Sequence, residues 1–93
     1  MNLGKAIKLC RTQKGMNQQQ LAEKADISVS YLSLLEKGKR DLNYSTLQNI
    51  AKGLSVPVSI ISFLAADEQE LSGINQVMRE KLSALSLELL AKS

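Results

Sequence analysis

The sequence predicts an all-α fold, in which five short helices form one domain and a C-terminal amphipathic helix follows. Apolar residues recur every three or four positions along most of the chain, which is the period of a helix with one buried face. No run alternates apolar and polar residues as a half-buried strand does. Only three of the 93 residues are aromatic. The core is therefore expected to consist of aliphatic side chains, which suits packed helices.

The first two helices are marked by the residues that begin and end them. A helix is expected over residues 3–14, and Gly15 stands where a helix commonly ends. Asn17 is a favourable N-cap for a second helix over residues 18–25, and Gln20 can complete a capping-box pair. The positions expected to face the core are Leu3, Ala6, Ile7, Cys10, Leu21 and Ala22.

Three further helices are predicted in the same way. Ser28 is the expected N-cap of a helix that runs from Val29 to about Lys37 and ends at Gly38. Asn43 can cap a fourth helix, and Pro57 fits the first turn of a short fifth one. Their buried positions are expected to be Leu32, Leu35, Leu47, Ile50, Ala51, Leu54, Val58, Ile60, Ile61 and Leu64.

The end of the chain differs from the rest. Asp67 followed by Glu70 resembles a capping box, and a helix can continue from there to about Lys92. We therefore expect a domain in residues 1–65 and a separate C-terminal helix in residues 66–93. The apolar stripe of that helix consists of Leu71, Ile74, Met78, Leu82, Leu85 and Leu89.

Composition excludes several classes of function. The chain has no histidine and a single cysteine, Cys10, so neither a zinc site nor a nucleophile–histidine pair can be assembled. One cysteine forms no internal disulfide and fits a reducing cytoplasm. No apolar run approaches the roughly 18–20 residues of a membrane span, and there is no signal region. We expect a cytoplasmic protein that is not an enzyme and needs no metal or cofactor.

The charge is distributed unevenly. Residues 1–65 carry nine basic and four acidic side chains, a net charge of +5, whereas residues 66–93 carry three and five, a net charge of −2. This asymmetry indicates that the first part alone faces a polyanion.

Residues 17–40 contain the most informative pattern, two short helices separated by about three residues, 25–27. This linker is too short for the two helices to run antiparallel, so they must cross steeply. A steep crossing brings the backbones close together and explains a small residue at Ala22. Ile27 can lock the second helix against the first, while the outer face of that helix is polar at Ser28, Ser30 and Ser33.

This stretch resembles the helix-turn-helix domains of the phage Cro and cI repressors and their XRE-like relatives. The resemblance covers residues 3–64 and includes Gln18, the Leu21–Ala22 pair, Ile27 and the EKGKR run after Leu35. It implies a five-helix repressor-type domain that binds double-stranded DNA as a homodimer and regulates transcription, as a repressor. In that family the third helix enters the major groove.

Carried over position by position, the resemblance also implies a set of site residues. The base-contacting positions are Ser28, Val29, Ser30, Ser33 and Leu34. The phosphate-contacting positions are Gln18, Tyr31, Lys37, Lys39, Arg40 and Asn43. Arg11 and Glu36 match a structural ion pair of the family. Purely structural alternatives stay open. The serines can be surface residues without a DNA contact, Val29 and Leu34 can belong to the core, and Tyr31 can pack against the fourth helix.

Two departures from the family pattern matter. Many relatives have glycine in the turn, where the backbone adopts a positive φ, but this chain has Asp26. The helix over residues 29–37 offers no Arg, Gln or Asn, which are the strong bidentate readers of guanine and adenine. Sequence specificity is then expected to come from small contacts, water and DNA deformability.

The C-terminal stripe has two possible uses. It can pair with the same stripe of a second copy, or it can fold back over its own domain. The alternative function is an antitoxin or a protein-interaction module that binds a partner protein through this helix.

Overall fold

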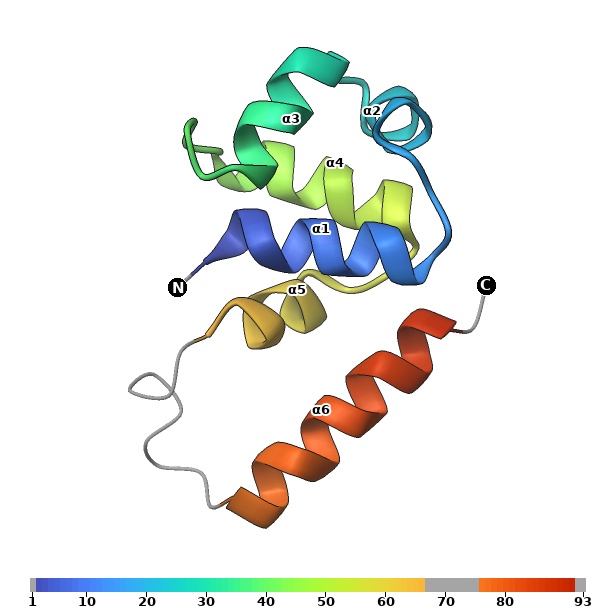
Figure 1. Cartoon of the computed structure of the whole chain (residues 1–93), viewed down its shortest axis with the longest axis vertical. Coiled ribbons are helices and arrows are strands. Elements are labelled where there is room, and N and C mark those ends of the chain that lie inside the picture. The colour runs from blue at the N-terminus through green and yellow to red at the C-terminus, as the bar shows by residue number, and fades with distance from the viewer. Residues whose placement is uncertain (1, 67–75, 92–93) are drawn as a thin grey trace.

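The computed structural model describes residues 2–66 and 76–91, and within these ranges every regular element is a helix (Figure 1). This confirms the predicted all-α fold. In chain order the helices are α1 (Leu3–Gln13), α2 (Gln18–Ala25), α3 (Val29–Glu36), α4 (Tyr44–Leu54), α5 (Val58–Ala65) and α6 (Gln76–Ala91).

The predicted helix starts follow from local hydrogen bonds. Asn17 and Gln20 form a complete capping box at α2, with N–O distances of 2.8 and 2.9 Å. Ser28 caps α3, and Asn43 caps α4 by accepting a hydrogen bond from the Thr46 amide. Three details differ from the prediction by one residue each, and the first is that α1 ends at Gln13 because Lys14 is already its C-cap. Pro57 is the N-cap of α5 and lies just before its first turn, and α3 ends at Glu36 because Lys37 is already its C-cap.

The core lies where α1, α4 and α5 meet the inner faces of α2 and α3. Helix α2 packs on α4, α1 packs on α5, and α3 contacts both α1 and α2. The start of α1 lies so close to the end of α3 that a Cβ atom on Gly4 would collide with the Leu35 carbonyl oxygen. The fully buried side chains include Ile7, Cys10, Leu21, Leu32, Leu35, Ile50, Leu54 and Ile61, all of them predicted core positions.

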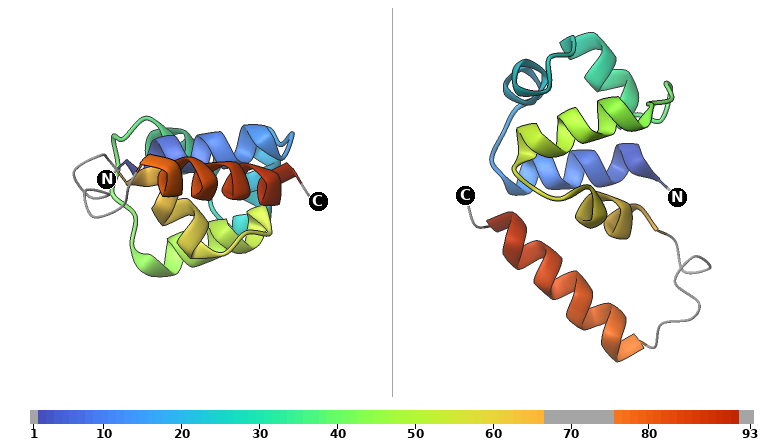
Figure 2. Two further views of the ribbon diagram at one scale, coloured as in Figure 1. Left: turned by 90° about the horizontal axis from the view of Figure 1, so that it is seen from below. Right: turned by 180° about the vertical axis from the view of Figure 1, so that it is seen from behind.

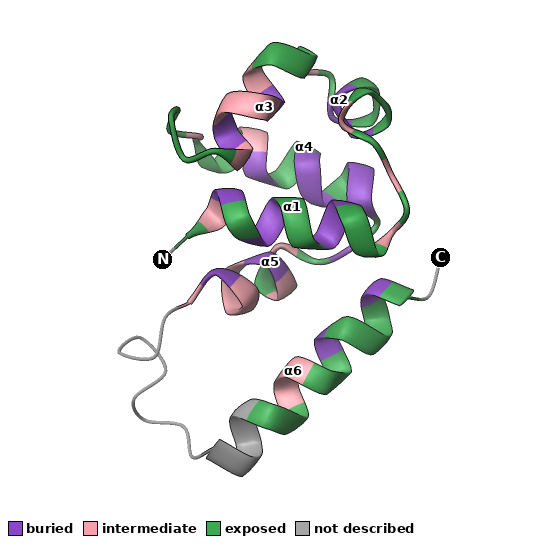
Figure 3. Ribbon diagram, in the orientation of Figure 1, coloured by how far each residue is buried: buried purple, intermediate pink, exposed green. Residues whose placement is uncertain are grey.

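Helix α6 folds back against its own domain, where it contacts α1 and α5 on the side away from α3 (Figures 1 and 2). Its inward face overlaps the predicted stripe only in part. Ser86 and Leu90 are buried, whereas Leu85 and Leu89 are 51% and 39% exposed. Most of the described part of α6 is exposed (Figure 3). Leu82 is half-buried. The predicted capping box at Asp67 and Glu70, the residues Leu71 and Ile74, and the side chain of Met78 lie outside the described residues.

Among the described residues, no single helix is long and apolar enough to cross a membrane. Helices α4 and α5 together are long and apolar enough, but the chain bends by 106° between them.

Candidate nucleic-acid interface

Helices α2 and α3 are joined by a tight turn at residues 26–28. Asp26 adopts the left-handed conformation expected for this position, with φ 57° and ψ 45°. The Ile27 amide donates to the Ala22 carbonyl at 3.0 Å, and the Ile27 side chain packs against the core. The view of Figure 1 runs nearly along α2 while α3 lies across it, so the two helices cross steeply as predicted. This turn holds α3 on the outside of the domain.

The outward side of α3 is formed mainly by its first turn. Ser28, Val29 and Ser30 are exposed, Val29 to 42%, and their side chains are short. Ser33 and Leu34 are half-buried, so these two lie at the edge of the surface. Ser28 also acts as the helix cap, because its Oγ accepts a hydrogen bond of 3.0 Å from the Tyr31 amide. Its hydroxyl hydrogen remains available to an outside acceptor.

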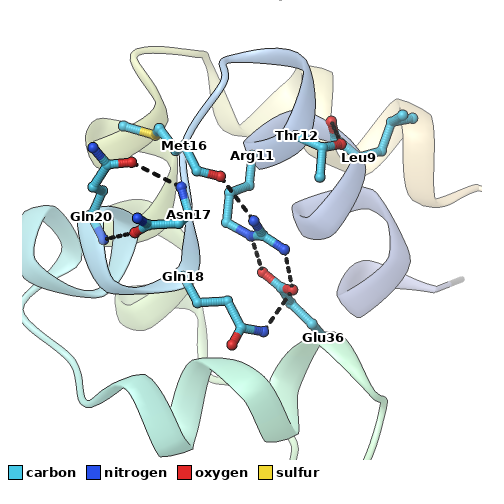
Figure 4. Close-up of polar contacts among 8 residues, drawn as sticks. All are labelled: Leu9, Arg11, Thr12, Met16, Asn17, Gln18, Gln20 and Glu36. Atoms are coloured by element: carbon cyan, nitrogen blue, oxygen red, sulfur yellow. Dashed lines mark hydrogen bonds and ion pairs between the residues drawn. The ribbon is translucent and has the colours of Figure 1, made fainter.

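An ion pair behind this surface ties three helices together (Figure 4). Arg11 of α1 donates from Nε and Nη2 to the two carboxylate oxygens of Glu36 at 2.7 and 2.9 Å, and from Nη1 to the Met16 carbonyl at 2.8 Å. The hydrogen bond to Glu36 raises the pKa of Arg11 above its usual value. Gln18, at the start of α2, donates from Nε2 to Glu36 at 3.1 Å. The network therefore sets the position of the α2 N-terminus relative to α3.

Gln18 is a predicted phosphate contact, but in the structure its side-chain amide also donates a hydrogen bond to Glu36. One amide hydrogen is used on Glu36, so a second amide hydrogen is left to donate. No pattern in the sequence pointed to this bond, because the two residues are 18 positions apart.

The loop between α3 and α4, residues 37–43, carries the cationic part of the surface. Lys37, Lys39 and Arg40 are all exposed, and Gly38 takes a positive φ of 73° that lets the chain turn away from α3. Asn43 uses its Oδ1 to cap α4, with an N–O distance of 2.8 Å, which leaves its amide nitrogen free to donate outward.

Two aromatic residues flank this loop. Tyr31 is half-buried, its hydroxyl donates to the Asp41 carbonyl at 3.3 Å, and the Arg40 guanidinium lies over its ring, 5.6 Å from the centroid. Tyr44, the first residue of α4, is 63% exposed next to Asn43. Tyr44 is not among the predicted site residues, although its place directly after an N-cap is a usable signal for an exposed residue.

Cys10 lies away from this surface. It is fully buried in α1, and burial raises the pKa of its thiol to about 11. The thiol is therefore protonated at neutral pH and does not reach solvent.

Comparisons with known proteins agree with this geometry. A helix-turn-helix family model matches residues 7–61. The immunity repressor protein of Bacillus phage phi105 is 41% identical over 61 residues, which are 66% of this chain and 42% of that protein. The competence pilus inhibition repressor of Acinetobacter baylyi is 36% identical over 73 residues, 78% of this chain and 66% of that protein.

Among solved structures, the crystal structure of the wild-type restriction-modification controller protein C.Esp1396I is similar, with a TM-score of 0.66 and 31% sequence identity. The similarity covers 76% of this chain and 91% of that one. The match to the phage repressor spans less than half of that repressor's length. Because the family model covers more than half of this chain, the chain belongs to the helix-turn-helix family, the family of Cro/cI-type and XRE-like proteins.

Proposed function

We propose that this protein is a DNA-binding transcriptional regulator, acting as a repressor, which docks α3 in the major groove of double-stranded DNA. One observation carries the proposal. The first turn of α3 presents short, exposed side chains, and a cationic loop lies directly after the same helix. Short side chains let a helix approach base edges closely, while cations beside it neutralise phosphates.

The proposed base contacts come from the start of α3. Ser28 and Ser30 supply hydroxyl groups, and the exposed methyl groups of Val29 suit the methyl group of a thymine. Ser33 and Leu34 are half-buried and would be reached at the edge of the groove. Such contacts discriminate weakly between bases, so DNA shape and deformability are expected to contribute to specificity.

The proposed phosphate contacts surround this helix. Lys37, Lys39 and Arg40 supply positive charge after α3, and the amide groups of Gln18 and Asn43 supply hydrogen-bond donors at the starts of α2 and α4. The Glu36 carboxylate behind them is compensated by Arg11, so it does not oppose the phosphates as a free charge. A DNA target and a single cysteine both suit a protein of the cytoplasm.

We further propose that the protein binds as a homodimer through the exposed apolar side of α6. Leu85 directly precedes the buried Ser86, and Leu89 directly precedes the buried Leu90. Neighbouring residues of a helix are about 100° apart, so the exposed leucines lie on the flank of α6 and not opposite its packed face. A second copy can pair there while α3 stays free. The dimer would present two α3 helices to half-sites about 34 Å apart.

The same leucines favour one rival function. A protein partner, as in an antitoxin, would also bury Leu85 and Leu89 and need not involve DNA. The two functions differ in the use of α3 and of the loop at residues 37–43. Binding of a protein partner through α6 gives neither of them a role, whereas DNA binding uses both.

Binding to DNA can be tested by selecting duplexes from a random pool and titrating salt on the selected sequence. We expect affinity to fall steeply with salt, because each neutralised phosphate contributes a log–log slope of about −0.9. The Lys39→Ala/Arg40→Ala variant should weaken binding tenfold or more and flatten the slope by about 2 for each bound protomer, because two cations are lost from each copy.

The matched control is Lys8→Ala/Lys52→Ala, which removes the same charge from exposed positions on α1 and at the end of α4. It should leave the slope nearly unchanged. Failure of the wild-type protein to bind any duplex in dilute buffer, or an equal loss in both double variants, would refute the proposal.

A further inference from the structure

The loop that carries the proposed phosphate contacts is held unevenly. Its first part is closed by backbone hydrogen bonds, from the Gly38 amide to Leu35 at 3.1 Å and from the Lys39 amide to Leu34 at 2.9 Å. For residues 40–42, the hydrogen bond described to the rest of the fold is the one that the Tyr31 hydroxyl donates to the Asp41 carbonyl. Tyr31 is thus the polar link between this part of the loop and α3.

Tyr31 also contacts the cation of the same segment. The Arg40 guanidinium lies over the tyrosine ring at 5.6 Å from the centroid, within the range of a cation–π interaction. The ring has a fixed place, because Tyr31 is half-buried and packs against the core. Arg40 itself is exposed, and a free arginine side chain loses considerable conformational entropy when it is held by a ligand.

We infer that Tyr31 is a positioning residue for phosphate recognition, which holds Arg40 in place before DNA arrives. The inference rests on the proposed DNA binding. A guanidinium held over an aromatic ring by its charge still has N–H donors directed away from the ring, and a phosphate oxygen can accept them. Ordering the side chain in advance reduces the entropy that is lost on binding. Tyr31 then acts through Arg40 and does not itself contact the phosphate.

A double-mutant cycle on the selected duplex tests this role. Tyr31→Leu removes the ring and should weaken DNA binding about two- to fivefold for each bound half-site, as expected for a cation–π contact at an exposed site. In an Arg40→Ala background the same substitution should have no further effect. Tyr31→Phe keeps the ring and loses the bond to Asp41, so its affinity should fall between those of the wild type and Tyr31→Leu.

The matched control is a second cycle that pairs Tyr31→Leu with Lys39→Ala, a loop cation that does not lie over the ring. These two substitutions should be additive. Thermal unfolding of each variant identifies the temperatures at which it is folded, and binding is measured there. If Tyr31 had a purely structural role, its substitution would weaken binding equally in every background.

Three outcomes overturn the inference. Additivity of Tyr31→Leu with Arg40→Ala, in a protein that does bind DNA, overturns it alone. A loss in Tyr31→Phe as large as in Tyr31→Leu, and unchanged by Arg40→Ala, identifies a direct phosphate contact instead. A wild-type protein that binds no duplex overturns the proposed function and this inference together.

Discussion

Arg11 and Glu36 are charged residues in a domain that otherwise buries aliphatic side chains. The Glu36 side chain is 3% exposed, so its carboxylate has lost nearly all of its hydration. Two hydrogen bonds from Arg11 and one from Gln18 replace that hydration. Such a pair adds little net stability compared with an apolar pair, but removal of one partner strands a buried charge.

The ion pair leads to a prediction about stability. Arg11→Met should lower the free energy of unfolding by roughly 3 kcal/mol, because it leaves the Glu36 carboxylate buried without its cation. The double variant Arg11→Met/Glu36→Leu should lose much less than the sum of the two single changes. Denaturant unfolding measures all three. Lys8→Met, at an exposed position on α1, is the control and should change stability by about 0.5 kcal/mol or less. Additive losses would contradict the prediction.

For single residues, the sequence indicated which side chains matter better than it indicated their contacts. The family resemblance implied that Arg11 pairs with Glu36, and the structure places the two together. It did not imply that Gln18 joins them or that Tyr31 reaches Asp41. Such bonds connect residues that are 10 to 18 positions apart, and they depend on how one helix end meets another.

Helix ends show the opposite behaviour, because their hydrogen bonds join residues three positions apart. The caps at Asn17, Ser28 and Asn43 were all predicted from the sequence and all occur. Helices α2 and α4 also end alike. Asp26 and Ser55 are their C-caps, and both have positive φ values, 57° and 58°. A residue with a Cβ atom is strained in this conformation, whereas glycine adopts it freely.

The two C-caps give a prediction for glycine substitutions. Asp26→Gly and Ser55→Gly should each raise the free energy of unfolding by about 0.5 to 1 kcal/mol, since relief of strain exceeds the added entropy of the unfolded chain. Thermal or denaturant unfolding provides the measurement. Gly15→Ala is the reverse control: φ is 71° and no atom lies near the new methyl group, so it should be destabilising through the backbone alone. A loss of stability in both glycine variants would be inconsistent with this account.

Across the whole molecule, α3 and α6 lie on opposite sides of the domain (Figures 1 and 2). The surface proposed for DNA therefore does not compete with the surface proposed for a second copy. Because Leu90 and Ser86 are buried in the contact that α6 makes with α1 and α5, cutting off this helix would also expose apolar parts of the domain. Substitutions on its exposed flank are a cleaner test.

The homodimer can be tested by the mass of the protein in solution. We expect Leu85→Gln/Leu89→Gln to convert a dimer into a monomer and to weaken binding to a two-half-site duplex, while thermal unfolding shows that the domain itself persists. The control Ala84→Gln/Glu88→Gln has the same spacing on another exposed side of α6 and should remain dimeric. Dimers that persist in the leucine variant would rule out this interface.

The sequence alone predicts which segments are helices, where these helices begin and end, and the turn between α2 and α3. These features depend on atoms within a few residues of one another. The domain core can be read as well, since the aliphatic residues of α1 to α5 recur on one side of each helix. The orientation of α6 cannot. Its apolar period identified the stripe that contains Leu85 and Leu89 but left open whether the helix pairs with a second copy or folds back, and in the structure Ser86 and Leu90 are the residues buried against the domain. A helical period identifies a stripe, but which side is buried depends on the shapes of the surfaces that α1 and α5 offer. The place of Arg40 over Tyr31 depends in the same way on a folded loop, which no local pattern encodes.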